Sequence, residues 1–303
     1  MISALLLRAA NSRRLERLAT GNPLSRSLVQ RYVAGTTLEE AIAVAKSLQS
    51  RRLQVSLDLL GESVTDLAEA SRATDEYVAT VQAIARQAPG ATVSVKLSQL
   101  GIAVDVETCL KNLQHLMEES AAVGVVVEVD MEHSSVGRDT LEVFRRLLDD
   151  HPESRVAIQA ALRTTSADLQ SFTGRRPRIR LVKGAYAEPI SRSLQNKDEI
   201  LAQYQHLTDW ALQNLPDPAF GTHDDACIDH VKIAAGKHGV LPSQYEFQML
   251  YGVRRDLQEQ LAADGYRIRL YVPFGTQWYP YLMRRMAERP ANLLLFLRSL
   301  VGG

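Results

Sequence analysis

The chain has 303 residues, 46% of them hydrophobic, and its 35 lysines and arginines are balanced by 35 aspartates and glutamates. This is enough for one sizeable core, and the lack of a basic excess argues against a nucleic-acid-binding protein. The two cysteines, Cys109 and Cys227, lie far apart, which argues against a disulfide scaffold and favours a reducing compartment such as the cytoplasm.

The segment up to residue 31 is strongly basic and contains a single acidic residue, Glu16. Its first apolar stretch is too short for a secretory signal because Arg8 interrupts it. A basic amphipathic helix either packs on the protein with its arginines in water or makes peripheral contact with the inner face of an anionic membrane. A transit peptide is a third alternative, so the sequence leaves the role of this segment open.

A helix is predicted just before the first strand. Thr37 followed by Glu40 is typical of a capping box, which would open a helix over Leu38–Gln49. We therefore expect two parts, an N-terminal helical arm over residues 1–50 and a catalytic barrel over residues 51–303.

Beyond residue 50, short apolar or β-branched runs alternate with stretches of helical periodicity. Eight runs have the length of a strand, the first and the sixth being the weakest: Gln54–Asp58, Thr92–Leu97, Val125–Asp130, Arg155–Gln159, Ile179–Val182, Ala219–Thr222, Tyr245–Gln248 and Ile268–Val272. Between them lie helical stretches such as Thr74–Gln87, Val106–Val123, Asp139–Asp149, Asp198–Leu215 and Cys227–His238. Strands that alternate with helices predict a parallel sheet, and eight such units predict a (β/α)8 barrel.

Polar side chains stand at nearly every predicted strand end, which is where barrels of this type place their active sites. They are Asp58, Lys96, Asp130 with Glu132, Gln159, Lys183, Thr222 with His223, Gln248 and Tyr271. Any one of them could simply mark the exit of a strand to solvent. As a set, they predict a functional site at one end of the barrel.

Lys96 has more than one interpretation. A lysine at a strand end can be a Schiff-base nucleophile, as in class I aldolases, or a protonated partner of Asp130 on the next strand. A metal site is disfavoured, since the clustered acids and histidines, such as His223 and Asp224, are sequence neighbours that seldom bind one ion together. Lys96 is therefore either a nucleophile or a paired charge.

The run RLVKGAY, residues 180–186, ends a predicted strand. Gly184 and Ala185 after Lys183 would let the backbone approach a phosphate or a flat ring, and Tyr186 would project over the mouth of the barrel.

The helix after the eighth strand carries Tyr281, Arg284, Arg285 and Glu288 at i, i+3, i+4 and i+7, so these residues share one face. A guanidinium presents a rigid fork that suits a carboxylate. The alternative is a solvated charged face. The position just after the last strand favours a carboxylate-binding site.

Together these segments resemble the proline dehydrogenase family, in its stand-alone bacterial form. The matching motifs occur in family order between about Val93 and Leu297: VSVKLSQLG, VEVDMEHSS, AIQAALR, RIRLVKGAY, FGTHDD, YEFQMLYG, RLYVPFG and YPYLMRRMAERPAN. The resemblance implies a distorted (β/α)8 barrel with non-covalent FAD. It also implies oxidation of L-proline to Δ1-pyrroline-5-carboxylate, the first step of proline catabolism, with a membrane quinone as electron acceptor.

The resemblance also implies roles for individual residues. Arg284 and Arg285 would bind the proline carboxylate, and Lys96 paired with Asp130 would lie beside it. The walls of the proline site would be Tyr186, Leu250, Tyr271 and Tyr281. The residues implied to contact FAD are Asp130, Gln159, Arg180, Val182, Lys183, Gly184, Ala185, Thr222, His223, Gln248, Arg285 and Glu288.

Three positions depart from the family pattern, in which Tyr often follows Gln-Ala in the fourth-strand motif and Asn often follows Thr-His in the sixth. Here these positions hold Ala161 and Asp224, and Ala187 stands after Tyr186, where the family often has an aromatic or charged residue. Asp224 adds negative charge where a cofactor contact is expected. The rival functions are oxidation of a related substrate such as hydroxyproline, a Schiff-base lyase that uses Lys96, and a flavin-free barrel that only binds proline or a partner.

Overall fold

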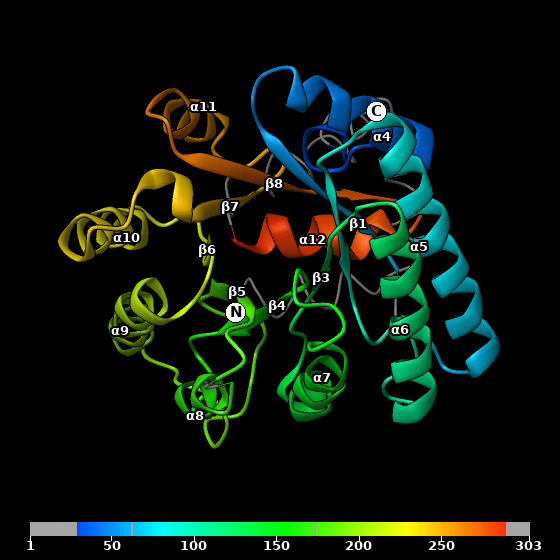
Figure 1. The fold of residues 1–303 in the computed structure, drawn as a ribbon, viewed down its shortest axis with the longest axis horizontal. Helices are drawn as coiled ribbons and strands as arrows, with labels where there is room; N and C mark the ends of the chain where they lie inside the picture. Colours follow the sequence, from blue (N-terminus) through cyan, green and yellow to red (C-terminus); the bar gives the residue numbers. More distant parts are fainter. Residues whose placement is uncertain (1–28, 62, 173, 289–303) are drawn as a thin grey trace, which may run out of the picture.

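The computed structural model describes residues 29–61, 63–172 and 174–288, without the side chains of residues 284–288. Its centre is a closed barrel of eight parallel strands, in which neighbours follow chain order and β8 pairs with β1 (Figure 1). The strands are β1 (Gln54–Leu59), β2 (Thr92–Val95), β3 (Val127–Val129), β4 (Arg155–Gln159), β5 (Arg178–Val182), β6 (Ala219–Gly221), β7 (Glu246–Leu250) and β8 (Arg267–Phe274). The predicted (β/α)8 barrel is confirmed.

Helices surround the strands in Figure 1, except the last of them, α12 (Trp278–Glu288), which lies across the middle of the view. They are α4 (Leu38–Gln49), α5 (Leu67–Gln87), α6 (Val106–Ala122), α7 (Ser134–Leu147), α8 (Thr165–Gln170), α9 (Lys197–Asn214), α10 (Asp225–His238), α11 (Arg255–Ala263) and α12 (Trp278–Glu288), with a 3-10 turn, η1, over Pro242–Gln244. No helix in the described part of the chain is both long enough and apolar enough to cross a bilayer.

The predicted elements agree with the structure to within two residues except at the starts of two helices. Helix α5 begins at Leu67, seven residues before the predicted start, because the side chain of Asp66 accepts a hydrogen bond from the backbone of Glu69 and caps the helix. Helix α7 begins at Ser134 instead of Asp139. Its first backbone N–H donates to Glu188, which lies 54 residues further along the chain, so this start depends on a tertiary contact.

Helix α4 packs on the barrel beside β1 and β8 and buries Ala41, Ile42, Ala45 and Leu48. The capping box predicted at Thr37 and Glu40 is confirmed, since each side chain accepts a hydrogen bond from the backbone of the other residue. Residues 1–28 of the predicted arm lie outside the described residues. The division of the chain at residue 50 therefore stays a prediction.

The two faces of the strands differ in polarity. In β1, Val55 and Leu57 are buried in the apolar layer between barrel and helices. Ser56 and Asp58 alternate with them and are also buried, and the Ser56 hydroxyl lies 2.9 Å from that of Ser94 on β2. Barrels of this type usually fill their interior with Val, Ile and Leu. In this barrel, polar and charged side chains occupy much of the interior.

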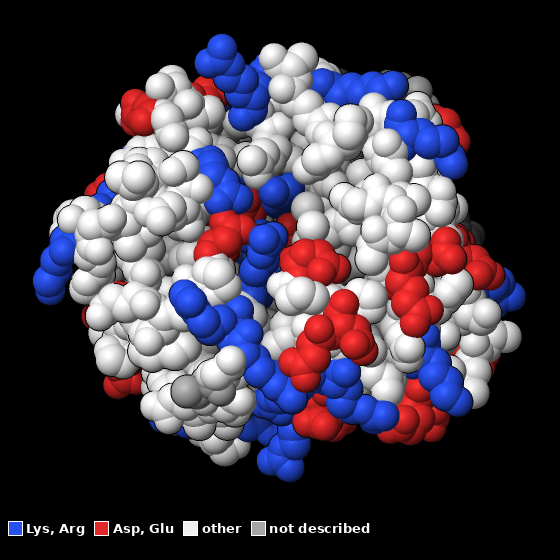
Figure 2. Space-filling view, in the orientation of Figure 1, with Lys and Arg blue, Asp and Glu red and all other residues white. Residues whose placement is uncertain are grey.

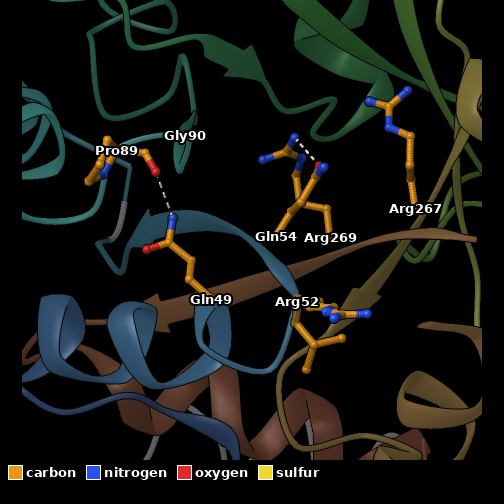
Figure 3. A pocket seen from close by; sticks show the side chains of 8 residues that line it. Gln49, Arg52, Gln54, Pro89, Gly90, Arg267 and Arg269 are labelled. Carbon is orange, nitrogen blue, oxygen red and sulfur yellow. Dashed lines mark hydrogen bonds between the residues drawn. The ribbon is translucent and has the colours of Figure 1, made fainter. Parts of the chain in front are cut away.

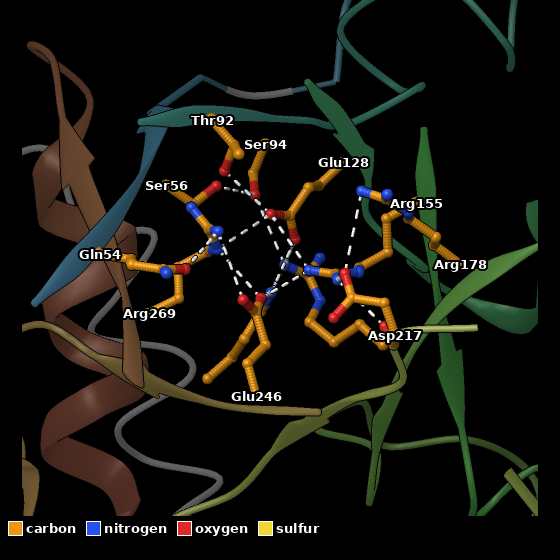
Figure 4. Close-up of polar contacts among 12 residues, drawn as sticks. Gln54, Ser56, Thr92, Ser94, Glu128, Arg155, Arg178, Asp217, Glu246 and Arg269 are labelled. Atoms are coloured by element: carbon orange, nitrogen blue, oxygen red, sulfur yellow. Dashed lines mark hydrogen bonds and ion pairs between the residues drawn. The ribbon is translucent and has the colours of Figure 1, made fainter. Parts of the chain in front are cut away.

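Ion pairs fill the N-terminal end of the barrel, and we call this group the barrel floor: Glu128, Arg155, Asp217, Glu246, Arg267 and Arg269. Figure 4 labels all of them except Arg267. Glu246 is fully buried and lies 2.5 Å from Arg155 and 3.0 Å from Arg269. Burial raises the pKa of Glu246, but the charges of Arg155 and Arg269 outweigh this effect and hold the pKa well below its ordinary value of 4.5. The floor is thus a network of charged side chains that closes the N-terminal end of the barrel.

Candidate active site

A cavity of about 660 Å³ lies at the C-terminal ends of the strands. Seven strands contribute lining residues, either from the strand itself or from the positions just after it. The remaining strand, β4, contributes Ala157 alone, and α12 contributes Tyr281. The predicted site residues among its lining are Lys96, Asp130, Arg180, Val182, Lys183, Gly184, Ala185, Tyr186, Thr222, His223, Gln248, Leu250, Tyr271 and Tyr281. Polar residues that are far apart in sequence therefore meet at one cavity, as the strand-end pattern predicted.

A smaller depression of about 310 Å³ lies at the N-terminal end, beside the floor (Figure 3). In it, Arg269 donates a hydrogen bond to Gln54, and Gln49 donates to the backbone oxygen of Pro89. Arg269 is also paired with Glu246. Figure 2 shows acidic and basic side chains side by side at the hollowed centre of the face that it displays. None of the predicted site residues lines this depression, so the larger cavity is the candidate site.

Lys96 is held at the base of the cavity by two carboxylates and a hydroxyl. Its ammonium nitrogen lies 2.5 Å from Asp58 Oδ1 and 3.3 Å from Asp130 Oδ2, and it donates to the Tyr271 hydroxyl at 2.9 Å. Tyr271 in turn donates to Asp130 Oδ2 at 2.6 Å. The predicted ion pair with Asp130 exists, but Asp58, one of the strand-end residues expected at the site, is the nearer partner.

The pairing of Asp58 with Lys96 was not predicted because it depends on the arrangement of the sheet. Asp58 stands on β1 opposite Ser94 of β2, and Ser94 precedes Lys96 by two residues. The sequence did contain a signal for this pairing. Asp58 is an acid at the end of the predicted first strand, which lies next to the strand of Lys96 in a closed barrel. Asp130, on the other neighbouring strand, was considered alone.

Arg180 joins the cavity to the floor. Its guanidinium is paired with Asp130 and with Glu128, 3.3 Å away, and it donates to Gln248 at 3.0 Å. Arg180 is almost fully buried, so it is fixed between these acids. We name the group Asp58, Lys96, Asp130, Arg180 and Tyr271 the mouth cluster.

Burial and neighbouring charges set the protonation states of the mouth cluster. Burial alone would lower the pKa of Lys96, but the charges of Asp58, Tyr271 and Asp130 raise it well above its ordinary value. Burial would raise the pKa of Asp130, but Arg180 and Lys96 make the net shift downward. Burial raises the pKa of Asp58, against the opposing charge of Lys96. Lys96 therefore stays protonated at neutral pH, and a protonated amine is a poor nucleophile.

The end of β5 brings the backbone to the cavity wall. Gly184 has a φ of +114°, and a Cβ there would lie 3.0 Å from Gln159 Oε1 and 3.1 Å from the Ala161 Cβ, so glycine fits this position best. Gln159 itself is not among the lining residues. Its amide donates to the backbone oxygens of Met131 and Glu132, so it braces the wall from behind.

The loop after β5 carries Tyr186 and is fastened to α7. The ring of Tyr186 packs on that of His133 with centroids 4.2 Å apart. Two residues on, Glu188 accepts hydrogen bonds from the backbone and the hydroxyl of Ser134. These contacts fix the wall that Tyr186 contributes.

The ends of β6 and β7 are joined by His223, whose Nε2 accepts a hydrogen bond from the backbone of Leu250 at 2.8 Å. That bond assigns the acceptor role to Nε2. Gln248 lines the cavity, and its amide donates to Glu128 and Glu246 below.

Helix α12 carries Tyr281, which lines the cavity, and continues to Glu288. The predicted helical spacing of Arg284, Arg285 and Glu288 is therefore present in the backbone. Their side chains lie outside the described residues, so their contacts stay predictions. In the described part of the chain, no three His, Cys, Asp or Glu residues are grouped as a metal ion would require.

Comparisons with known proteins agree on one family. The family model for proline dehydrogenase matches residues 41–294. Proline dehydrogenase 1 of Bacillus subtilis is 36% identical over 272 residues, which are 90% of each chain. Proline dehydrogenase of Deinococcus radiodurans is 35% identical over 282 residues, 91% of each chain.

Solved structures agree with this family and its fold. Proline utilization A from Bdellovibrio bacteriovorus, inactivated by N-propargylglycine, has a TM-score of 0.81 and 27% identity, covering 86% of this chain and 32% of that protein. A mutant of Bradyrhizobium japonicum proline utilization A has a TM-score of 0.75 and 25% identity, covering 91% of this chain and 32% of that one. The chain therefore belongs to the proline dehydrogenase family of enzymes and has the (β/α)8 barrel of its relatives.

Proposed function

We propose that this enzyme oxidises L-proline to Δ1-pyrroline-5-carboxylate with FAD as cofactor, and that a membrane quinone takes the electrons. The observation that carries the proposal is the mouth cluster, in which Lys96 is paired with Asp58 and Asp130 at the base of a roomy cavity. Membership of the proline dehydrogenase family supports the substrate. The quinone and any membrane contact rest on the family resemblance alone.

The cavity fits a flat ring with an anionic tail. Its volume of about 660 Å³ lies within the range of small-molecule and cofactor sites. Val182 and Leu250 supply apolar wall, Gly184 lets the backbone come close, and Lys183 supplies a positive charge at the rim. Bound there, FAD would supply the acceptor for a hydride from proline C5.

We assign the flavin contacts to one lining residue just after β3, to lining residues from β5 to β7, and to two residues of α12. They are Asp130, Arg180, Val182, Lys183, Gly184, Ala185, Thr222, His223, Gln248, Arg285 and Glu288. Gln159 acts indirectly, by bracing the wall next to Gly184.

Lys96, Arg284 and Arg285 are proposed to bind the proline carboxylate, and Tyr186, Leu250, Tyr271 and Tyr281 to enclose the ring. Asp58 keeps Lys96 protonated and in place. Because hydride loss from proline requires a neutral amine, cations beside the substrate help by lowering the pKa of its ammonium group. Holding the carboxylate also fixes C5 in one orientation.

The Schiff-base alternative conflicts with the surroundings of Lys96. A nucleophilic lysine must lose its proton, whereas the charges of Asp58, Tyr271 and Asp130 raise the pKa of Lys96 well above its ordinary value, against the effect of burial. That alternative predicts trapping of a substrate adduct by borohydride, and we expect none.

An absorbance spectrum of the purified protein, before and after anaerobic L-proline, tests the proposal. We expect flavin bands that bleach with L-proline and persist with D-proline, which serves as a matched control. Flavin bands that ignore L-proline but bleach with hydroxyproline would change the substrate. A colourless protein that stays inactive after FAD is added would refute the flavoenzyme assignment.

A further inference from the structure

Lys183 and Asp224 form an ion pair at the rim of the cavity. The lysine nitrogen lies 2.6 Å from Asp224 Oδ2, and both residues line the cavity. Lys183 follows β5 and Asp224 follows β6, and these strands are neighbours in the sheet. Both side chains are partly exposed, with 31% and 44% of their surface accessible, so the pair faces whatever enters the cavity.

Lys183 stands apart from the other cations of this cavity. Among the described lining residues the cations are Lys96, Arg180 and Lys183. In the mouth cluster, Lys96, with 17% of its side chain exposed, is paired with Asp58, and the buried Arg180 is paired with Asp130. Lys183 is thus the lining cation best placed to meet an anionic group of a ligand near the solvent.

Asp224 is held in place by hydrogen bonds that do not involve Lys183. Its Oδ1 accepts a hydrogen bond from the backbone of Ala226 at 2.9 Å and so caps α10. Its own backbone N–H donates to the Thr222 hydroxyl at 3.1 Å. The hydrogen bond from Lys183 lowers the pKa of Asp224, so the carboxylate is ionised at neutral pH and neutralises the lysine.

We propose that Asp224 is a built-in counter-ion of Lys183 that lowers the affinity of the cavity for the phosphate groups of its flavin nucleotide. A phosphate that approaches Lys183 competes with a carboxylate held 2.6 Å from the same nitrogen, and it is repelled by that carboxylate. The inference rests on the proposed flavin cofactor. It makes Asp224 a determinant of cofactor affinity, separate from the residues proposed to bind proline.

The substitution Asp224→Asn tests this with little structural change, because asparagine caps a helix about as well as aspartate. We expect the dissociation constant for FAD, measured from the fluorescence of flavin released on dilution of the holoenzyme, to fall about fivefold at low ionic strength. The difference should shrink towards none at about 1 M NaCl, where charges are screened within about 3 Å.

Asp225→Asn is the matched control. It makes the same change of charge one residue further on, but Asp225 pairs with Arg254 at 2.6 Å and does not line the cavity. We expect its affinity for FAD to match that of the wild type. Equal tightening in both variants would indicate a general charge effect and overturn the inference.

Two further outcomes would also overturn it. One is an unchanged FAD dissociation constant in Asp224→Asn, and the other is a tightening that persists at high salt. In either case a wild-type enzyme that binds flavin and oxidises proline leaves the proposed function intact. A wild-type protein that binds no flavin would instead remove the proposed function.

Discussion

The floor and the mouth cluster use the same kinds of residue inside one barrel, and they differ in what lies beside them. In the floor, Glu246 is packed against Arg155 and Arg269 with no exposed surface. In the mouth cluster, Lys96 and Tyr271 line a cavity of about 660 Å³. Arg180 belongs to the mouth and reaches Glu128 of the floor, so the two groups are continuous.

Burial of charge alone therefore does not identify an active site. Breaking a dry ion pair leaves a charge without water and mainly costs stability. Beside a cavity, water or a ligand can replace a lost partner, so the same change mainly alters binding and chemistry. Asp58 belongs to the second case, since it lines the cavity while it is paired with Lys96.

The largest expected effect is on the floor. Glu246→Gln removes the acid shared by Arg155 and Arg269, so it should lower the free energy of unfolding by about 3–5 kcal/mol. Urea denaturation at neutral pH measures this, with Asp217→Asn as a milder control because Asp217 is partly exposed. If Asp217→Asn lowered the free energy of unfolding more than Glu246→Gln, burial would not determine how much stability is lost.

Tyr271→Phe tests the mouth. It removes the hydroxyl that joins Lys96 to Asp130 and keeps the ring, so kcat/KM for proline should fall about 10- to 100-fold, given the strength of hydrogen bonds to charged groups. The free energy of unfolding should change by less than about 1 kcal/mol, because cavity water can replace the hydroxyl. Full activity combined with a large loss of stability would reverse the roles that we assign to mouth and floor.

The ion pairs of the floor should also make the free energy of unfolding depend on pH. The folded protein holds the pKa of Glu246 below its ordinary value of 4.5, so the stabilisation is present above that pH and is lost as the pH falls below it. The loss per group approaches about 1.4 kcal/mol per pH unit. Urea midpoints near neutrality and at about pH 3 should therefore differ less for Glu246→Gln than for the wild type. Parallel pH profiles would contradict this.

The smallest effect belongs to the exposed edge of the floor. Arg178 lies 3.8 Å from Asp217 and is 37% exposed, so Arg178→Ala should change the free energy of unfolding by less than about 0.5 kcal/mol. A cost comparable to that of Glu246→Gln would show that the network acts as one unit out to its edge.

Local signals in the sequence predicted much of this molecule. The alternation of strand and helix patterns predicted the barrel, and the capping box at Thr37 predicted the start of α4. Residues at the strand ends, such as Lys96, Lys183 and Tyr271, were expected to converge and do line one cavity. These features depend on residues close together in the chain or on the rule that parallel strands end at one edge.

Contacts between distant segments decided the rest. Asp58, instead of Asp130, is the nearest partner of Lys96, because the register of β1 and β2 sets which side chains meet inside the barrel. Glu188 sets the start of α7 from 54 residues away. Gln159 stands behind the wall that it was expected to line. Local patterns in the sequence place these residues at the strand ends, whereas barrel closure sets which of them pair, because pairing follows distances across the barrel that local periodicity does not contain.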